Sequence, residues 1–96
     1  MPSTIRQIPL ASATHHHTHD FHQIVITLCG SSEFEIEGLG GRVNAFSGCI
    51  VPANHEHYYS GYGHNRQLIF DLPEDAPALT GENRELVALF DAPRFF

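Results

Sequence analysis

Histidines are the residues whose type and spacing in this chain could do chemistry. Five of the eight lie in the segment HHHTHDFHQ, and His55 and His57 follow a proline in VPANHEHYY. His17 and His19 are two residues apart, as are His55 and His57, so on a strand each pair points to one face. Two such pairs on facing strands would gather three or four imidazoles around one point, as a metal or ligand site requires.

Each group of histidines also has an alternative interpretation that involves no metal or ligand site. The internal position of the run at 15–17 argues against a purification tag. An exposed loop without function is the alternative for three of them: His15, His16 and His22. The alternative for the others is a polar lining at the mouth of a barrel, where imidazoles bond to neighbours and water; these are His17, His19 and His57.

The elements around the histidines are predicted to be strands. Apolar or alternating runs at 23–30, 33–38, 48–52 and 66–73 are separated by glycine-rich turns, and 5–10 is predicted to be an edge strand. In 33–38, Phe34 and Ile36 share one face and three glutamates share the other, which indicates a half-buried strand. We interpret the glutamates as a solvated face rather than as a catalytic pair. Short strands at regular spacing predict an all-β sandwich or barrel, not βαβ units.

The composition changes at Pro73. Residues 73–79 are acidic and contain proline, which is typical of a linker. A short helix is predicted to follow, with Thr80 as its N-cap and an apolar stripe formed by Leu86, Leu89 and Phe90. We therefore expect a β-barrel over 1–72 and a linker with one helix over 73–96.

Charge and cysteine content exclude several classes of protein. The formal charge is −6, lysine is absent, and the five arginines are scattered, so direct nucleic-acid contact by this chain is not expected. No apolar run has the length of a membrane span, and no signal peptide is evident, so we expect a cytoplasmic protein without membrane contact. Cys29 and Cys49 are interpreted as buried free thiols, with a disulfide as the less favoured alternative.

The histidine segments resemble the two motifs of the cupin superfamily. His17-Thr18-His19 matches H-x-H, Gln23 stands where the motif has glutamate, and Gly30 matches its closing glycine. In the second motif, Gly48 is the opening glycine, the segment 52–54 replaces P-x-G, and His57 matches the histidine. The opening glycine of the first motif is missing. The resemblance implies a small, jelly-roll-like antiparallel β-barrel of the cupin type with one short C-terminal helix.

The resemblance also implies a ligand set. Metal-binding cupins use the two histidines of the first motif, its glutamate and the histidine of the second. On this chain these positions are His17, His19, Gln23 and His57, and the candidate cofactor is a divalent transition metal such as Zn, Ni, Fe or Mn. Tyr59, His55 and Phe21 are expected to contact a small-molecule ligand. The neutral Gln23 weakens the case for tight metal binding, although three histidines remain.

The chain resembles one group of cupins in particular, the sensor domains of AraC-type transcriptional regulators. The segments that carry this resemblance are HTHDFHQIVITLCGSSEFEIEG, GCIVPANHEHYY, LIFDLP and LFDAPRFF. It implies a domain that binds a small-molecule effector, with 73–96 as the start of a connection to a DNA-binding region. It also supports the homodimer that we expect from the apolar stripe of Leu86, Leu89 and Phe90 or an adjoining barrel edge. A stand-alone metal-dependent enzyme, an oxygenase or isomerase, is the alternative. It is less favoured because Glu56, the obvious carboxylate in the motif segments, should face outward. A structural cupin that merely dimerises is a third alternative.

Overall fold

Two long antiparallel strands form the centre of the molecule. The computed structural model describes residues 2–12, 15–79 and 84–96. Strand β3 (Phe21–Ile36) pairs with β6 (His57–Pro73) along its whole length, from Phe21 opposite Pro73 to Ile36 opposite His57. The register shifts between Thr27 and Ser31, where Gly30 has a φ of 75°. This bulge bends the paired strands, so each contributes to two layers.

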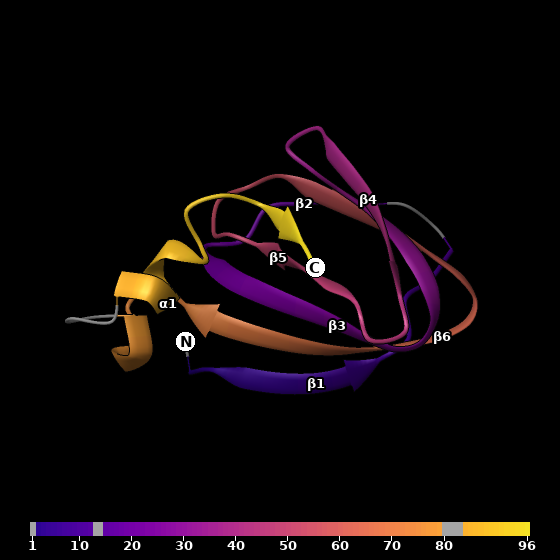
Figure 1. Cartoon of the computed structure of the whole chain (residues 1–96), viewed down its shortest axis with the longest axis horizontal. Helices are drawn as coiled ribbons and strands as arrows, with labels where there is room; N and C mark the ends of the chain where they lie inside the picture. Colours follow the sequence, from indigo (N-terminus) through magenta and orange to yellow (C-terminus); the bar gives the residue numbers. More distant parts are fainter. Residues whose placement is uncertain (1, 13–14, 80–83) are drawn as a thin grey trace.

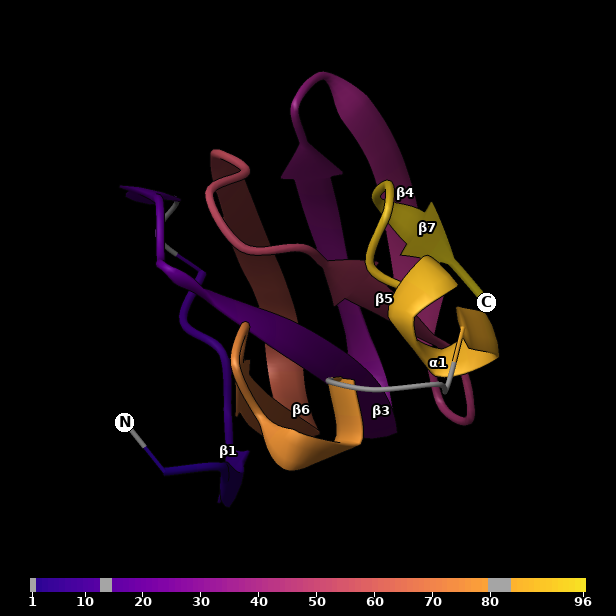
Figure 2. The same ribbon diagram turned by 90° about the vertical axis from the view of Figure 1, so that its left-hand side faces the viewer.

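The shorter strands extend these layers. In the first layer, β1 (Thr4–Ile8) pairs with the second half of β6, and β5 (Gly48–Val51) joins the first half of β3 to β7 (Arg94–Phe95). In the second layer, β2 (His15–His17) pairs with the first half of β6, and β4 (Leu39–Asn44) pairs with the second half of β3. Figures 1 and 2 show how the two layers enclose an interior.

Side-chain alternation fills the interior from both layers. Val25, Cys49, Val51 and Ile69 point inward from the first layer, and the second layer contributes residues such as Phe34, all of them buried. Period-two alternation explains this core, because every second residue of a strand points to the same face. As predicted, Phe34 and Ile36 are buried whereas Glu33 is exposed.

The fold prediction is confirmed: the chain is mostly antiparallel sheet with one short helix. The boundaries differ at Gly30, because the predicted strands 23–30 and 33–38 are one strand. Because Gly30 adopts a positive φ, the strand continues through a bulge at this position instead of ending there. His64 lies within β6 and is exposed. Both cysteines are free, with Cys49 buried and Cys29 half-buried.

The C-terminal segment returns to the barrel. After η1 (Pro77–Leu79), helix α1 spans Arg84–Ala88, and the proposed N-cap Thr80 lies outside the described residues. The last residues form β7, which places Arg94 opposite Ile50 and Phe95 opposite Cys49. The boundary between 1–72 and 73–96 stays a prediction. Within the described ranges, no helix is long and apolar enough to cross a membrane.

Candidate functional site

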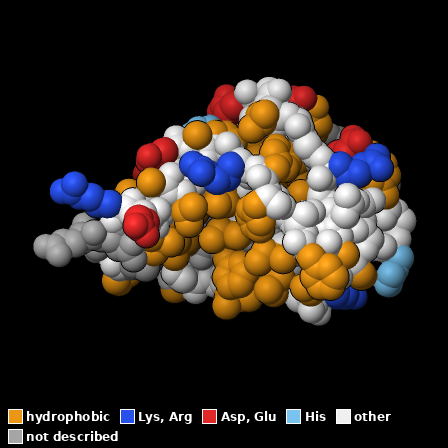
Figure 3. Space-filling view, in the orientation of Figure 1, with side chains coloured by type: hydrophobic (Ala, Val, Ile, Leu, Met, Phe, Trp, Pro, Cys, Tyr) orange, Lys and Arg blue, Asp and Glu red, His pale blue; other side chains and the backbone are white. Residues whose placement is uncertain are grey.

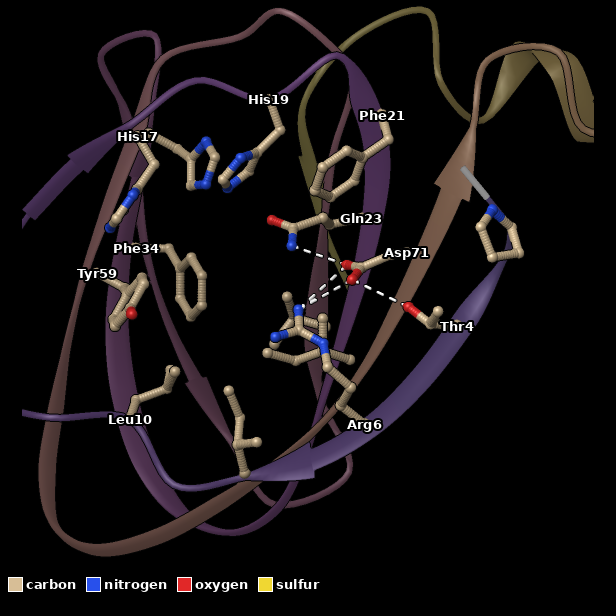
Figure 4. A pocket seen from close by; sticks show the side chains of 15 residues that line it. Thr4, Arg6, Leu10, His17, His19, Phe21, Gln23, Phe34, Tyr59 and Asp71 are labelled. Atoms are coloured by element: carbon tan, nitrogen blue, oxygen red, sulfur yellow. Dashed lines mark hydrogen bonds and ion pairs between the residues drawn. The ribbon is translucent and has the colours of Figure 1, made fainter.

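A cavity of about 540 Å³ lies between the two layers. Its walls are apolar at one end and carry imidazoles and a carboxylate at the other (Figure 4). Cavities of this size are typical of small-molecule sites. The lining residues are Pro2, Thr4, Arg6, Ile8, Leu10, His17, His19, Phe21, Gln23, Val25, Phe34, His57, Tyr59, Ile69 and Asp71.

Three imidazoles gather at the polar end of this cavity. His17 in β2 is the cross-strand partner of His57 in β6, and His19 follows in the connection to β3. The ring centroids are 6.0 Å apart for His17 and His57, 5.2 Å for His19 and His57, and 5.7 Å for His17 and His19. The backbone pairing of β2 with β6 therefore brings together residues 40 positions apart in the sequence.

His57 is held in a defined orientation. Its side chain is buried, and its Nδ1 lies 3.0 Å from the carbonyl oxygen of His55. Because a carbonyl only accepts, Nδ1 must carry the proton and donate, which leaves the Nε2 lone pair available in the neutral ring. Metal-binding histidines in proteins characteristically make this contact with a backbone carbonyl.

Burial favours the neutral form of two of these imidazoles, His19 and His57. Desolvation lowers the pKa of His57 below its usual 6.5; the bond to His55 raises it in part, and His19 and His17 lower it again. Burial also lowers the pKa of His19, with a further contribution from His17. Neutral imidazoles have lone pairs that a metal ion or a ligand hydrogen can use.

A network around Asp71 orients the amide of Gln23. Gln23 Nε2 donates to Asp71 Oδ1 at 2.9 Å, and the Thr4 hydroxyl donates to Oδ2 at 3.1 Å. Arg6 forms an ion pair with the same carboxylate at 3.0 Å. A carboxylate only accepts, so the amide nitrogen must face Asp71, and Figure 4 shows the amide oxygen on the imidazole side.

Six of the seven site residues proposed from the sequence line the cavity, and one does not. His55 lies in the turn before β6 and its Nδ1 is 3.0 Å from the carbonyl oxygen of Ala53. Sequence reasoning missed Thr4, Arg6 and Asp71. A usable signal was that Asp71 shares one face of its strand with the apolar Ile69, because a carboxylate on an inward face needs partners. The six lining residues are His17, His19, Phe21, Gln23, His57 and Tyr59.

His22 and His16 lie on the outside of the barrel. His22 is half-buried rather than in an exposed loop: its Nδ1 accepts the Ala53 N–H at 2.8 Å, and its ring stacks on Phe90 at 4.3 Å. Burial lowers the pKa of His22 too. His16 lies 3.1 Å from Glu56, and both are well exposed, as the sequence predicted for Glu56. The side chain of His15 lies outside the described residues.

The donor types fit a divalent transition metal, but the rings are too far apart to hold one as they stand. Rings bound to one tetrahedral zinc have centroids about 5 Å apart, given zinc–nitrogen bonds of about 2.0–2.1 Å. The His19–His57 distance of 5.2 Å matches, whereas the two distances to His17 are longer. Among the described residues, no group of three or more histidine, cysteine or acidic side chains is arranged to hold a metal ion.

The lowered histidine pKa values predict that acid destabilises the chain. His19, His22 and His57 bind protons more weakly when folded than when unfolded, where the pKa is about 6.5. The unfolded state therefore takes up protons first, and stability that is present above pH 6.5 falls as the pH drops below it. The buried His57 contributes at most about 1.4 kcal/mol per pH unit, and the more exposed His19 and His22 contribute less because solvent screens them.

Thermal unfolding in EDTA between pH 7.5 and 5.5 measures this effect. We expect Tm to fall, and His57→Asn to reduce the slope because it removes the most buried of the three imidazoles. His64→Asn is the matched control, since His64 is exposed. A Tm that stays constant over this range would contradict the prediction.

Comparisons with known proteins agree with this architecture. No family model matches the chain. A curated relative from Photobacterium leiognathi, described as "Probable transcriptional regulator LumQ", is 39% identical over 62 residues, which are 65% of this chain and 25% of the relative. The chain therefore spans about a quarter of the length of this relative.

Solved structures identify the fold. The SPY1581 protein of unknown function from Streptococcus pyogenes has a TM-score of 0.65 at 19% identity, over 77% of this chain and 65% of that one. The Cnp3 cupin domain of Schizosaccharomyces pombe has a TM-score of 0.61 at 16% identity, over 74% and 54%. The DMSP lyase DddQ of Ruegeria pomeroyi has a TM-score of 0.60 at 21% identity, over 83% of this chain and 44% of that one. The chain has the cupin fold.

Proposed function

We propose that the chain is the small-molecule-sensing cupin domain of an AraC-type transcriptional regulator and that its effector binds in the cavity between the layers. The cavity is the observation that carries the proposal. It combines an apolar end with oriented imidazoles and the amide of Gln23, which suits a small organic molecule with a polar group. The similarity to a probable transcriptional regulator supports the regulatory role.

A divalent metal is part of this proposal. His17, His19 and His57 would hold it, with the oxygen of Gln23 beside them, after a small inward movement of His17. A bound metal would act as a Lewis acid and orient a polar group of the effector. In this role Phe21 and Tyr59 would contact the body of the effector. We propose a cytoplasmic location, with DNA contact left to another part of the regulator.

An enzyme is the second candidate, and the imidazole cluster is the observation that favours it. One similar structure is a DMSP lyase, at 21% identity. A sensor and an enzyme differ in what happens to the bound compound. A sensor releases its effector unchanged, whereas an enzyme converts it.

The test combines binding with recovery of the compound. A panel of small organic acids, amines, sugars and alcohols is screened by thermal shift, with and without Zn²⁺, Ni²⁺, Fe²⁺ or Mn²⁺. A compound at 100 times its Kd adds about 2.7 kcal/mol, which raises Tm by roughly 10 °C or more in a domain of this size. Each binder is then recovered and analysed by mass spectrometry.

Matched variants tie binding to the cavity. His19→Ala should reduce the thermal shift, whereas His16→Ala should not, because His16 lies outside the cavity. An unchanged binder supports the sensor, and a converted one supports the enzyme. A panel without any binder, or one whose binders are indifferent to His19→Ala, would contradict the proposed cavity function.

A further inference from the structure

The cavity has a closed end, which lies away from the imidazoles. Along β6, the inward residues from the imidazole end are Asp71, Ile69 and Gln67. Asp71 and Ile69 line the cavity, whereas Gln67 and its cross-strand partner Thr27 do not. The cavity therefore ends in front of Gln67 and Thr27.

A buried polar network lies behind this closed end. The Thr27 hydroxyl donates to Gln67 Oε1 at 2.8 Å. Gln67 Nε2 in turn donates to Ser32 Oγ at 3.3 Å and to Asn65 Oδ1 at 3.4 Å. Each of the four residues is at most 3% exposed, and none of them lines the cavity. Among the described residues, every buried side-chain nitrogen and oxygen has a hydrogen-bond partner, so the network is complete without a ligand.

Leu10 contacts both the polar network and the cavity. Its N–H donates to Asn65 Oδ1 at 2.8 Å, and Asn65 Nδ2 donates back to the Leu10 carbonyl at 3.0 Å. Its side chain lines the cavity and belongs to the core cluster that contains Phe34. Figure 4 shows Leu10 at the end of the pocket away from His19. The Leu10 side chain is therefore an apolar wall between the cavity and the polar network.

The position of Leu10 is fixed, although residues 9–12 form neither strand nor helix. Beside the two bonds to Asn65, the Gly61 N–H donates to the Ala11 carbonyl at 2.8 Å. A side chain at position 61 would collide with the Leu10 carbonyl, so a glycine there permits the close approach of the two segments. Because its backbone is held in this way, Leu10 presents its side chain to the cavity in one defined place.

The closed end of the cavity suits an apolar group of limited length. Each methylene group buried there should raise the affinity about fourfold, until the bound molecule reaches Leu10. A polar group carried to this end would lose its water in front of an apolar wall. The other side chains around the closed end are apolar or aromatic, namely Ile8, Val25, Phe34, Tyr59 and Ile69.

We propose that Leu10 determines which effectors fit the cavity, because it limits the length of their apolar part and excludes polar groups from the closed end. This role rests on the effector binding proposed above for the cavity. Truncation of Leu10 would deepen the cavity and uncover the amides of Asn65 and Gln67. Since amides donate and accept hydrogen bonds, the closed end would then accept polar groups as well as longer molecules.

Straight-chain 1-alkanols of about two to twelve carbons, and the diols with a hydroxyl at each end, are the probes that test this role. Dissociation constants are measured by NMR titration. In the wild type, affinity should rise about fourfold per carbon and then stop rising at a limiting length. In Leu10→Ala, the limiting length should be about three carbons greater, because the change removes three carbons from the wall. The preference for an alkanol over the diol of equal length should fall at least about fivefold.

Two further variants keep the test decisive if Leu10→Ala folds poorly. Leu10→Val removes one carbon and should increase the limiting length by about one carbon at a smaller cost in stability. Leu10→Phe tests the opposite direction, since its larger ring should extend into the cavity and shorten the limiting length. Circular dichroism and thermal unfolding check that each variant is folded.

Leu39→Ala is the matched control for alcohol bound to the outer surface, where apolar side chains are also exposed (Figure 3). Leu39 is 47% exposed on β4, so the same chemical change there should leave the limiting length and the diol preference unchanged. Val43→Ala controls for a loosened core, because Val43 is buried and does not line the cavity.

A limiting length that is the same in the wild type, Leu10→Ala and Leu10→Phe would overturn the role of Leu10. A limiting length that increases equally in Val43→Ala would overturn it as well. In both cases the alcohols would still bind in the cavity, so the proposed cavity function would stand. If neither the wild type nor any variant bound an alkanol, the closed end would take no apolar chain and the role of Leu10 would fail. The wider panel of compounds then decides the cavity function separately.

Discussion

Replacing His57 by alanine is expected to weaken Zn²⁺ or Ni²⁺ binding by more than about 100-fold. His57 is the buried imidazole of the cluster, and its Nδ1 bond to the His55 carbonyl presents Nε2 as a lone-pair donor. Removing a residue that merely supports a metal ligand typically costs 10–100-fold in affinity. Removing a ligand should cost at least as much. Competition titration against a chelating dye measures the change.

The exposed His64 supplies the control for surface binding. His64→Ala should leave the affinity within about twofold, because His64 does not line the cavity. The wild-type affinity should be nearly constant between pH 7 and 8 and should fall below about pH 6, since a metal needs neutral imidazoles. Equal affinities of His57→Ala and the wild type, or equal wild-type affinities at pH 5 and pH 8, would show that the metal binds elsewhere.

The pattern of residues was enough to predict the fold class but not the strand boundaries. Alternation around Phe34 and Ile36 identifies a half-buried strand, because period two is a property of the local chain. At Gly30 the local signal fails. A glycine is compatible with both a strand end and a bulge, and the pairing partner across the sheet decides between them.

The candidate site shows the same division between local and long-range information. His17 and His57 become neighbours through the pairing of β2 with β6, which motif similarity anticipated and local patterns could not. The shared face expected for His55 and His57 does not occur, because His55 lies in a turn where period two does not apply. Arg6 and Asp71 were missed because alternation alone does not say which face of a strand is buried.

Asp71→Asn is expected to lower Tm by about 10 °C and to weaken binding at the imidazole cluster. Asp71 is the common acceptor for Thr4, Arg6 and Gln23. Hydrogen bonds to a charged group contribute about 1.5–3 kcal/mol each. Losing charge from one buried acceptor should therefore cost about 2 kcal/mol, and each kcal/mol shifts Tm by about 4–8 °C in a domain of this size.

The exposed ion pair between Arg42 and Glu33 provides the matched control for charge removal. Arg42 Nη2 and Glu33 Oε1 lie 3.2 Å apart, and both side chains are more than half exposed. Exposed pairs contribute about 0–1 kcal/mol, so Glu33→Gln should shift Tm much less than Asp71→Asn. Equal Tm shifts for the two variants would show that Asp71 stabilises the fold no more than an exposed carboxylate does.

The effect of Asp71→Asn on metal binding follows from the orientation of the Gln23 amide. With aspartate at position 71, only the Gln23 nitrogen can face it, so the oxygen points to the imidazoles. Asparagine can donate as well as accept, so the Gln23 amide would be free to turn and present hydrogens to the cluster. Metal affinity should then fall even at temperatures where Asp71→Asn is fully folded. Unchanged affinity in the folded variant would show that the oxygen of Gln23 has no part in the site.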